Sequence, residues 1–354
     1  MLEKYLQHYA EPGPQRYKEI PACDYVLVIP VRDEAVNPLY ARLQNLLKHH
    51  NALVVLVINQ PISQTCGTPN AKLWHALGGN HHSEVILTCG QGHIMLLDHW
   101  REGRCLNDKH GVGLARKIGM DLACRLIQDK RVSNPWIYSS DADVLWPQDY
   151  FLQTKKVSTD ASVCIYRFEH GTSDYAIDLA TQLYEFSLFY YVGGLAHAHS
   201  AYAYHTVGST LAIHYKNYAM VRGVPKRAAA EDFYLLNKLS KTGPVTSLRG
   251  TPLKIDARNS HRVPFGTGPA TKAINQMQNP ASEYTFYHPE CFNVLARCIT
   301  TFENPNLALN WYDHSDELVR LLLESINADK IIRNADSQSS DLETYKKHIR
   351  NYFD

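Results

Sequence analysis

Apolar residues near the start of the chain form two unbroken runs separated by an amphipathic segment. Tyr25 to Pro30 and Leu53 to Ile58 contain no charged or amide side chain, which is typical of strands buried on both faces of a sheet. Between them, Pro38 to His50 carries leucines at a helical spacing. A strand, a helix and a strand in this order predict a βαβ unit with parallel strands.

The same alternation continues to about residue 270. Further strands are predicted at 84–88, 135–140, 161–168 and 208–214, and helices at 111–128, 176–191 and 229–239. After that point Asn-Pro pairs separate helical segments such as 314–326 and 342–352. We therefore expect an irregular lead-in over 1–22, a Rossmann-like α/β domain with a mixed, mostly parallel sheet over 23–270, and a helical C-terminal segment over 271–354.

The composition is that of a globular protein with a sizeable core, because 45% of the 354 residues are hydrophobic and 20% are charged. The 36 Lys and Arg barely exceed the 35 Asp and Glu, which argues against a nucleic-acid partner. The sequence has no apolar run near the roughly 20 residues that cross a bilayer and no signal-peptide pattern. Its eight cysteines contain no CxxC pair. These features predict a soluble, cytoplasmic protein with reduced thiols.

Two acids follow one of the predicted buried strands directly. Asp141 and Asp143 are separated only by Ala142 and come after the strand predicted at 135–140, and open α/β sheets bind ligands at such strand ends. Two carboxylates this close are unfavourable unless a cation compensates them. Mg²⁺ and Mn²⁺ commonly share their oxygen ligands between carboxylates and substrate phosphates. The pair therefore indicates a cation that bridges to a diphosphate, against the alternative of a solvated turn or a helix cap.

Around this pair the sequence resembles family 2-like glycosyltransferases with the GT-A fold over roughly residues 24–265. The matching segments, in chain order, are Val28 to Glu34, Asn59, Lys109 to Gly119, Asp141 to Asp143, and Glu231 with Asp232. They are similar to the family's nucleotide-binding turn, base-contacting residue, helix beneath the diphosphate, DxD motif and acidic motif near the acceptor. The resemblance implies a GT-A fold, a nucleoside-diphosphate sugar such as a UDP- or GDP-sugar as donor, and Mn²⁺ or Mg²⁺ as cofactor.

The resemblance also implies roles for individual residues. Asp141 and Asp143 would hold the metal together with His261, and Asp232 would act as general base while Glu231 contacts a hydroxyl acceptor. The residues expected to bind the nucleotide are Pro30, Arg32, Glu34, Asn59, Lys109, Gly111, Arg116, Asp141 and Ala142.

Other residues are expected on the acceptor side or near a phosphate. Gly208 and Ser209 resemble an acceptor-side loop, where small residues permit close backbone approach. Arg258 and Arg262, with a glycine turn after them, suit an anionic group, either the donor diphosphate or a phosphate or carboxylate on the acceptor.

Three alternatives remain open at this point. A phosphatase or phosphotransferase of the haloacid-dehalogenase type also places Asp-x-Asp after an apolar strand and uses the first Asp as nucleophile, although that strand usually comes first in the domain. A nucleotidyltransferase usually has a glycine-rich loop after the first strand, and the turn from Val31 to Ala35 contains no glycine. A sugar-nucleotide-binding protein without catalytic activity would bind donor and metal, and replacing Asp232 would leave it unchanged.

Overall fold

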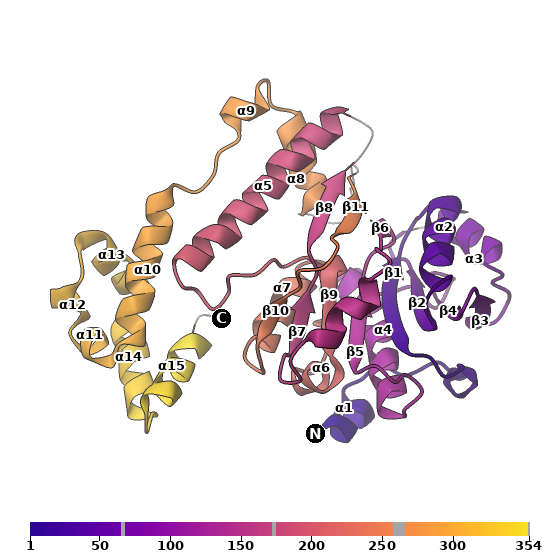
Figure 1. Ribbon diagram of the computed structural model, residues 1–354, viewed down its shortest axis with the longest axis horizontal. Coiled ribbons are helices and arrows are strands. Elements are labelled where there is room, and N and C mark those ends of the chain that lie inside the picture. The colour runs from indigo at the N-terminus through magenta and orange to yellow at the C-terminus, as the bar shows by residue number, and fades with distance from the viewer. Residues whose placement is uncertain (65–67, 172–174, 258–265, 353–354) are drawn as a thin grey trace. The chain divides into compact units, whose positions relative to one another are not determined.

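The computed structural model describes residues 1–64, 68–171, 175–257 and 266–352 (Figure 1). The chain divides into two compact units, the first made of residues 1–184 and 206–277 and the second of residues 185–205 and 278–354. Helix α5 (Tyr175–His197) contributes to both because the boundary falls within it. Every element described after residue 278 is a helix, which confirms the helical C-terminus.

An eight-stranded sheet with the strand order β10-β7-β9-β5-β1-β2-β4-β3 forms the centre of the first unit. Four neighbouring pairs are parallel (β1–β2, β1–β5, β2–β4 and β7–β10), and three are antiparallel (β3–β4, β5–β9 and β7–β9). The strands are β1 (Tyr25–Val31), β2 (Ala52–Asn59), β3 (Glu84–Cys89), β4 (Gly92–His99), β5 (Trp136–Ser139), β7 (Val163–Ile165), β9 (Leu211–His214) and β10 (Val245–Ser247). This mixed, mostly parallel sheet with flanking helices confirms the predicted fold class.

Helices cover the sheet, since every residue of β2 and all but one of β1 are buried. Helix α4 packs on β1 and β2 (Figure 1), and Gly119 permits the close approach because a Cβ there would lie 3.1 Å from a Val57 methyl carbon. The helical elements of this unit are α1 (Leu2–His8), η1 (Tyr17–Glu19), α2 (Val36–Leu47), α3 (Thr68–Ala76), α4 (Gly111–Gln128), η2 (Tyr150–Lys156), η3 (Gly208–Thr210), α6 (Tyr215–Met220), α7 (Glu231–Leu239), α8 (Thr267–Asn275) and the start of α5.

A second, three-stranded sheet has the order β6-β11-β8, formed by β6 (Val144–Leu145), β11 (Leu253–Asp256) and β8 (Phe168–Gly171). The single strand expected at 161–168 is therefore wrong, because its two ends belong to different sheets. The chain leaves β7 at Tyr166, whose buried hydroxyl donates to the carbonyl oxygen of Tyr150 (2.7 Å). The first strand of this small sheet, β6, begins directly after the acidic turn at residues 141–143.

The irregular lead-in expected over residues 1–22 is wrong for its first part, since residues 2–8 form helix α1. Its Tyr5 is buried, and the Tyr5 hydroxyl donates to Asp121 on α4 (2.5 Å). Lys117 pairs with Asp121 (Nζ–Oδ2 2.9 Å) and donates to the Tyr5 hydroxyl oxygen, and Tyr218 also donates to Asp121. This buried network ties the N-terminal helix to the core. Because it is made of polar side chains, the hydrophobic pattern of the sequence gave no sign that they are buried.

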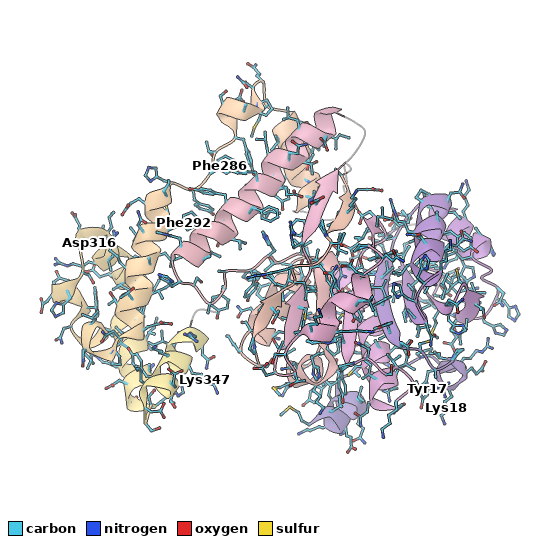
Figure 2. All side chains as sticks on the ribbon, in the orientation of Figure 1. Tyr17, Lys18, Phe286, Phe292, Asp316 and Lys347 are labelled. Atoms are coloured by element: carbon cyan, nitrogen blue, oxygen red, sulfur yellow. The ribbon has the colours of Figure 1, made fainter. Side chains whose placement is uncertain are left out.

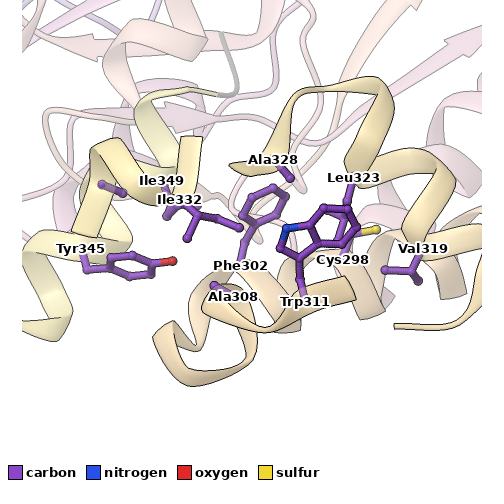
Figure 3. Close-up of a cluster of buried hydrophobic side chains, with 11 residues drawn as sticks. Cys298, Phe302, Ala308, Trp311, Val319, Leu323, Ala328, Ile332, Tyr345 and Ile349 are labelled. Atoms are coloured by element: carbon purple, nitrogen blue, oxygen red, sulfur yellow. The ribbon is translucent and has the colours of Figure 1, made fainter. Parts of the chain in front are cut away.

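The second unit is helical and has its own core (Figure 3). Its elements after α5 are α9 (Pro280–Glu283), α10 (Pro289–Glu303), α11 (Pro305–Leu309), α12 (Trp311–His314), α13 (Glu317–Ser325), α14 (Ala328–Ser337) and α15 (Leu342–Asn351). Phe302, Trp311 and Ile332 are among the buried side chains of that core. The helix expected at 314–326 is interrupted, because Asp316 caps the start of α13 by accepting from the Val319 amide.

Aromatic side chains pack along the end of α5 in this unit. Figure 2 shows Phe286 and Phe292 beside the helix, and both rings contact Tyr190 with centroids 5.6 and 5.7 Å apart. Tyr190 therefore takes part in packing, as its helical spacing favours. None of the helices in the described ranges is long and apolar enough to span a membrane.

Candidate functional site

The carboxyl ends of neighbouring parallel strands meet at one edge of the large sheet. β1, β2, β4 and β5 run in the same direction, and Asn59 at the end of β2 aligns with His99 at the end of β4. Arg32 follows β1, and Asp141 comes two residues after Ser139 ends β5. The turn expected to bind a nucleotide and the acidic pair therefore lie at the edge where open α/β sheets bind ligands.

The acidic turn after β5 is held by its backbone and by an arginine of α2. The Arg42 guanidinium donates to the Ala142 carbonyl oxygen (Nη1–O 2.8 Å) and pairs with Asp256 at the end of β11. The Asp256 amide donates to the carbonyl oxygen of Asp143 (3.1 Å). The Asp141 side chain is 40% exposed. Its carboxylate is thus open to a ligand from solvent while the backbone beneath it is fixed.

Arg116 of α4 is the buried cation of this site. Its Nη2 donates to Asp141 (3.0 Å) and its Nε to Glu231 (3.2 Å). Its Nη1 donates to the Ser139 hydroxyl (2.7 Å) and to the Gly208 carbonyl oxygen (3.3 Å). Burial alone would lower the pKa of this guanidinium, but the charges of Asp141 and Glu231 outweigh burial and raise it. Arg116 therefore stays charged and joins the DxD turn to the acidic motif at the start of α7.

Glu231 and Asp232 begin α7 after a strained residue. Ala230 has a φ of 59°, a left-handed conformation that costs free energy for a residue with a Cβ and is concentrated at functional sites. Glu231 is buried, and Asp232 accepts from the Gly208 amide (Oδ2–N 2.9 Å). Burial raises the pKa of both carboxyl groups, and the Arg116 charge opposes that shift. Both acids are thus more basic than a solvated carboxylate.

The glycines at the start of α4 accommodate neighbouring backbone. A Cβ on Gly111 would lie 2.7 Å from the Ala228 Cα, and one on Gly113 would lie 2.5 Å from the Pro225 carbonyl oxygen. The Gly113 amide donates to the carbonyl oxygen of Arg227 (3.0 Å). The loop before α7 therefore packs closely against these glycines, in a segment that the resemblance places beneath the diphosphate.

The residues after β1 and β2 form a polar cluster. The Asn59 amide group donates to the carbonyl oxygens of Val31 (3.0 Å) and Val57 (3.1 Å), so it links the ends of the two strands. Arg32 donates to the Gln64 side chain (2.9 Å). Within the described residues, two buried atoms, the Arg32 Nε and the Asp33 Oδ1, have no hydrogen-bond partner, and Asp33 has a φ of 53°. Unsatisfied buried groups and backbone strain next to each other are typical of ligand sites.

The two acids of the DxD turn fit a hard divalent cation, because Mg²⁺ and Mn²⁺ take oxygen ligands and commonly keep waters and substrate phosphates in their shell. In residues 1–64, 68–171, 175–257 and 266–352, no three His, Cys, Asp or Glu side chains gather as a metal site. Further ligands would therefore come from a phosphate, from water or from outside these ranges. His261, Arg258 and Arg262 lie outside the described residues.

The structure brings part of the expected site together. One network contains Arg116, Asp141, Gly208, Glu231 and Asp232. Ser209 is buried beside Gly208, Pro30 is in β1, Glu34 is buried, and Lys109 is exposed before α4. Sequence reasoning missed Ser139, whose place before the two acids could have suggested it, and Arg42, for which the sequence contains no signal.

No family model matches the sequence, and no curated protein matches it. Two solved structures with similar chain traces are glycosyltransferases by name. The mannosyltransferase PcManGT from Pyrobaculum calidifontis, in complex with GDP-Man and Mn²⁺, is 14% identical with a TM-score of 0.40, over 99% of this chain and 90% of that chain. The apo bifunctional glycosyltransferase WbbM is 11% identical with a TM-score of 0.32, over 64% of this chain and 39% of that chain.

Proposed function

We propose that this protein transfers a glycosyl group from a nucleoside-diphosphate sugar to a hydroxyl acceptor, with a divalent cation at Asp141 and Asp143. The observation that carries the proposal is the Arg116 bridge, which binds Asp141 at the end of β5 and Glu231 at the start of α7. This bridge holds Asp141, the proposed ligand of the metal, close to Glu231, the proposed contact of the acceptor.

On the donor side, the polar cluster of Arg32, Asp33 and Gln64 offers a nucleoside the Arg32 Nε and the Asp33 Oδ1, which are unsatisfied among the residues that the structure describes. Glu34 and Asn59 flank it and remain candidate nucleoside contacts, and Lys109 remains a candidate diphosphate contact. A bound Mn²⁺ or Mg²⁺ would neutralise the diphosphate as it leaves. His261 is the candidate third protein ligand, and Arg258 and Arg262 are candidate contacts to an anionic group.

On the acceptor side, Asp232 is the general base. Its raised pKa favours removal of the acceptor hydroxyl proton at neutral pH, and the Gly208 amide fixes its orientation. The acceptor oxygen then bonds to the anomeric carbon while the bond to the diphosphate oxygen breaks. The diphosphate leaves with that electron pair, and this single displacement inverts the anomeric configuration.

Arg116 acts in this scheme as a positioning residue. Its guanidinium donates to Glu231, Asp141, Ser139 and Gly208, and its side chain is 4% exposed. Because these donors are used within the protein, the guanidinium is better suited to positioning Asp141 and Glu231 than to binding the diphosphate.

The phosphatase alternative is not favoured. It requires Asp141 as nucleophile, and the Asp141 carboxylate accepts from the buried Arg116 guanidinium. A charge-assisted hydrogen bond stabilises the lone pair that would have to attack phosphorus.

Thermal unfolding with sugar nucleotides tests the donor site. Wild-type protein should be stabilised by a UDP- or GDP-sugar together with Mn²⁺, by about 2.7 kcal/mol when the ligand is present at a hundred times its Kd. Asp143→Asn should lose this stabilisation, whereas the exposed Asp160→Asn, a matched acid in the same unit, should keep it. Full donor stabilisation in Asp143→Asn would contradict the proposed cation site.

The catalytic step is tested separately. Asp232→Asn should still bind donor and Mn²⁺, because the amide oxygen can accept from Gly208, but should transfer sugar about 100-fold more slowly or worse. Transfer at the wild-type rate in this variant would exclude Asp232 as the base.

A further inference from the structure

Two aromatic side chains on the first turn of α7 are exposed directly after the catalytic candidate Asp232. Phe233 is 50% exposed and Tyr234 is 38% exposed. The opposite face of the helix supplies the core, because Leu235, Leu236 and Leu239 are buried. The two rings are therefore not needed for packing α7 onto the core, and adjacent exposed aromatic rings are typical of a binding surface.

The two rings have a defined geometry. Their centroids are 5.4 Å apart with an interplanar angle of 84°. The Arg227 guanidinium carbon lies 3.8 Å from the centre of the Tyr234 ring, a cation–π contact that fixes that ring. The Arg227 backbone is fixed as well, because its carbonyl oxygen accepts from the Gly113 amide. This aromatic ledge, made of Arg227, Phe233 and Tyr234, is a preformed surface.

A sugar ring has the chemistry that such a ledge accepts. One face of a pyranose carries C–H groups that contact an aromatic face through weak polarised contacts and dispersion, while its hydroxyl groups lie around the rim. An aromatic ring costs little conformational entropy when it binds, because it has only two side-chain torsions. The hydroxyl rim of a sugar on Phe233 would face the neighbouring residue, Asp232.

We propose that the aromatic ledge binds the acceptor and that the acceptor is a saccharide whose ring stacks on Phe233, while the nearly perpendicular Tyr234 ring contacts its edge. This inference rests on the proposed glycosyl transfer and extends it by naming the class of acceptor. Stacking orients the sugar, and Asp232 takes the proton from one of its hydroxyl groups. The ledge stands at the start of a helix, so the orienting surface and the base move as one rigid element.

The test uses the full chain with Mn²⁺ and the sugar nucleotide that stabilises it most. Release of the nucleoside diphosphate is measured with and without methyl glycosides of common hexoses and with the corresponding disaccharides. A saccharide that accelerates release is then titrated against wild type, Phe233→Leu and Tyr234→Leu. Leucine keeps an apolar side chain and removes the ring, so folding is preserved while stacking is lost.

We expect the KM for the saccharide to rise about tenfold in each variant, with the KM for the donor unchanged, and Phe233→Tyr to restore binding. Tyr9→Leu is the matched control, because Tyr9 is 39% exposed and lies under Arg222 at 4.6 Å but belongs to the N-terminal segment. It should titrate like wild type.

The outcomes separate the two proposals. If wild type shows no stabilisation by any sugar nucleotide with Mn²⁺, the proposed function fails. If donor binding is intact but no saccharide accelerates release, or if the leucine variants titrate like wild type, the aromatic ledge is not the acceptor site and the proposed function stands.

Discussion

Arg116→Met perturbs the buried ion network most directly. Methionine keeps an unbranched apolar stem and removes the guanidinium, so the acids lose their cation while packing is largely kept. Glu231, which is 5% exposed, is then left without the cation that Arg116 supplied. Asp141 is 40% exposed and can be solvated by water.

The expected magnitude follows from this difference in burial. Removing one partner of a buried ion pair costs about 3–5 kcal/mol, because the remaining charge stays desolvated. We assign this cost to Glu231, since water screens an exposed acid such as Asp141. At roughly 2–4 °C per kcal/mol for a unit of this size, the Tm at pH 8 should fall by roughly 10 °C.

The loss should depend on pH, with a sign set by the Glu231 pKa. Burial raises the pKa of Glu231 and Arg116 opposes that shift, so removing Arg116 raises it further. A carboxyl group whose pKa is higher in the folded state contributes its full stability below the unfolded pKa of about 4.3. That contribution is lost as the pH rises toward the folded pKa. Arg116→Met should therefore be closer to wild type at pH 5 than at pH 8.

Urea unfolding followed by tryptophan fluorescence at pH 5 and pH 8 measures both effects. Arg125→Met is a matched control on the same helix, because Arg125 donates to the Leu6 carbonyl oxygen rather than to an acid. Adding Glu231→Gln to Arg116→Met removes the unpaired charge and should restore much of the lost stability at pH 8. A loss below 1 kcal/mol at pH 8, or an equal loss at both pH values, would refute the reasoning.

Five further substitutions have expected outcomes. Gly113→Ala places a Cβ against two backbone carbonyl oxygens and should cost about 1–3 kcal/mol in urea unfolding. A Cβ on Gly193 has no tertiary neighbour within 4 Å among the described residues, so Gly193→Ala should be neutral or stabilising by roughly 0.5–1 kcal/mol. Tyr5→Phe leaves a buried carboxylate with one hydrogen bond fewer and should lower the unfolding free energy by about 1–3 kcal/mol. Phe302→Ala should cost the second unit about 3–5 kcal/mol, seen as earlier proteolysis of that unit. Asp232→Asn should raise the Tm at pH 8 while it slows transfer, because burial disfavours the ionised carboxyl group.

The parts of the fold that could be predicted from the sequence are the strands and helices whose buried positions form an unbroken apolar run or an unbroken helical pattern. The helix expected at 111–128 has those bounds in α4, and the two long apolar runs are β1 and β2. β4 was missed because its apolar centre is only four residues long and is flanked by the polar side chains of His93 and Asp98. The division of residues 161–168 between two sheets depends on tertiary partners, which local periodicity does not contain.

For the candidate site, the sequence pattern indicates where the acids stand relative to the strands and helices, but it does not indicate which side chains contact one another. The acids after β5 and at the start of α7 are recognisable because each follows or begins a regular element. The role of Arg116 could not be read in the same way, since its partner Glu231 is 115 positions away. Glycines at a helix start look alike in sequence whether they admit a phosphate or, as at Gly113, a loop backbone.

The charges of Arg116 and of the acids around it explain why these groups are placed together. Arg116 is the cation paired with Asp141 and Glu231, and each of these acids has another acid within two positions of it in the sequence, Asp143 and Asp232. Excess negative charge can be relieved by a proton or by a second cation. A proton on Asp232 would remove the proposed base, so the proposed mechanism assigns this role to the cation. In the proposed mechanism, the buried arginine fixes the geometry of the site, and an exchangeable cation binds together with the diphosphate.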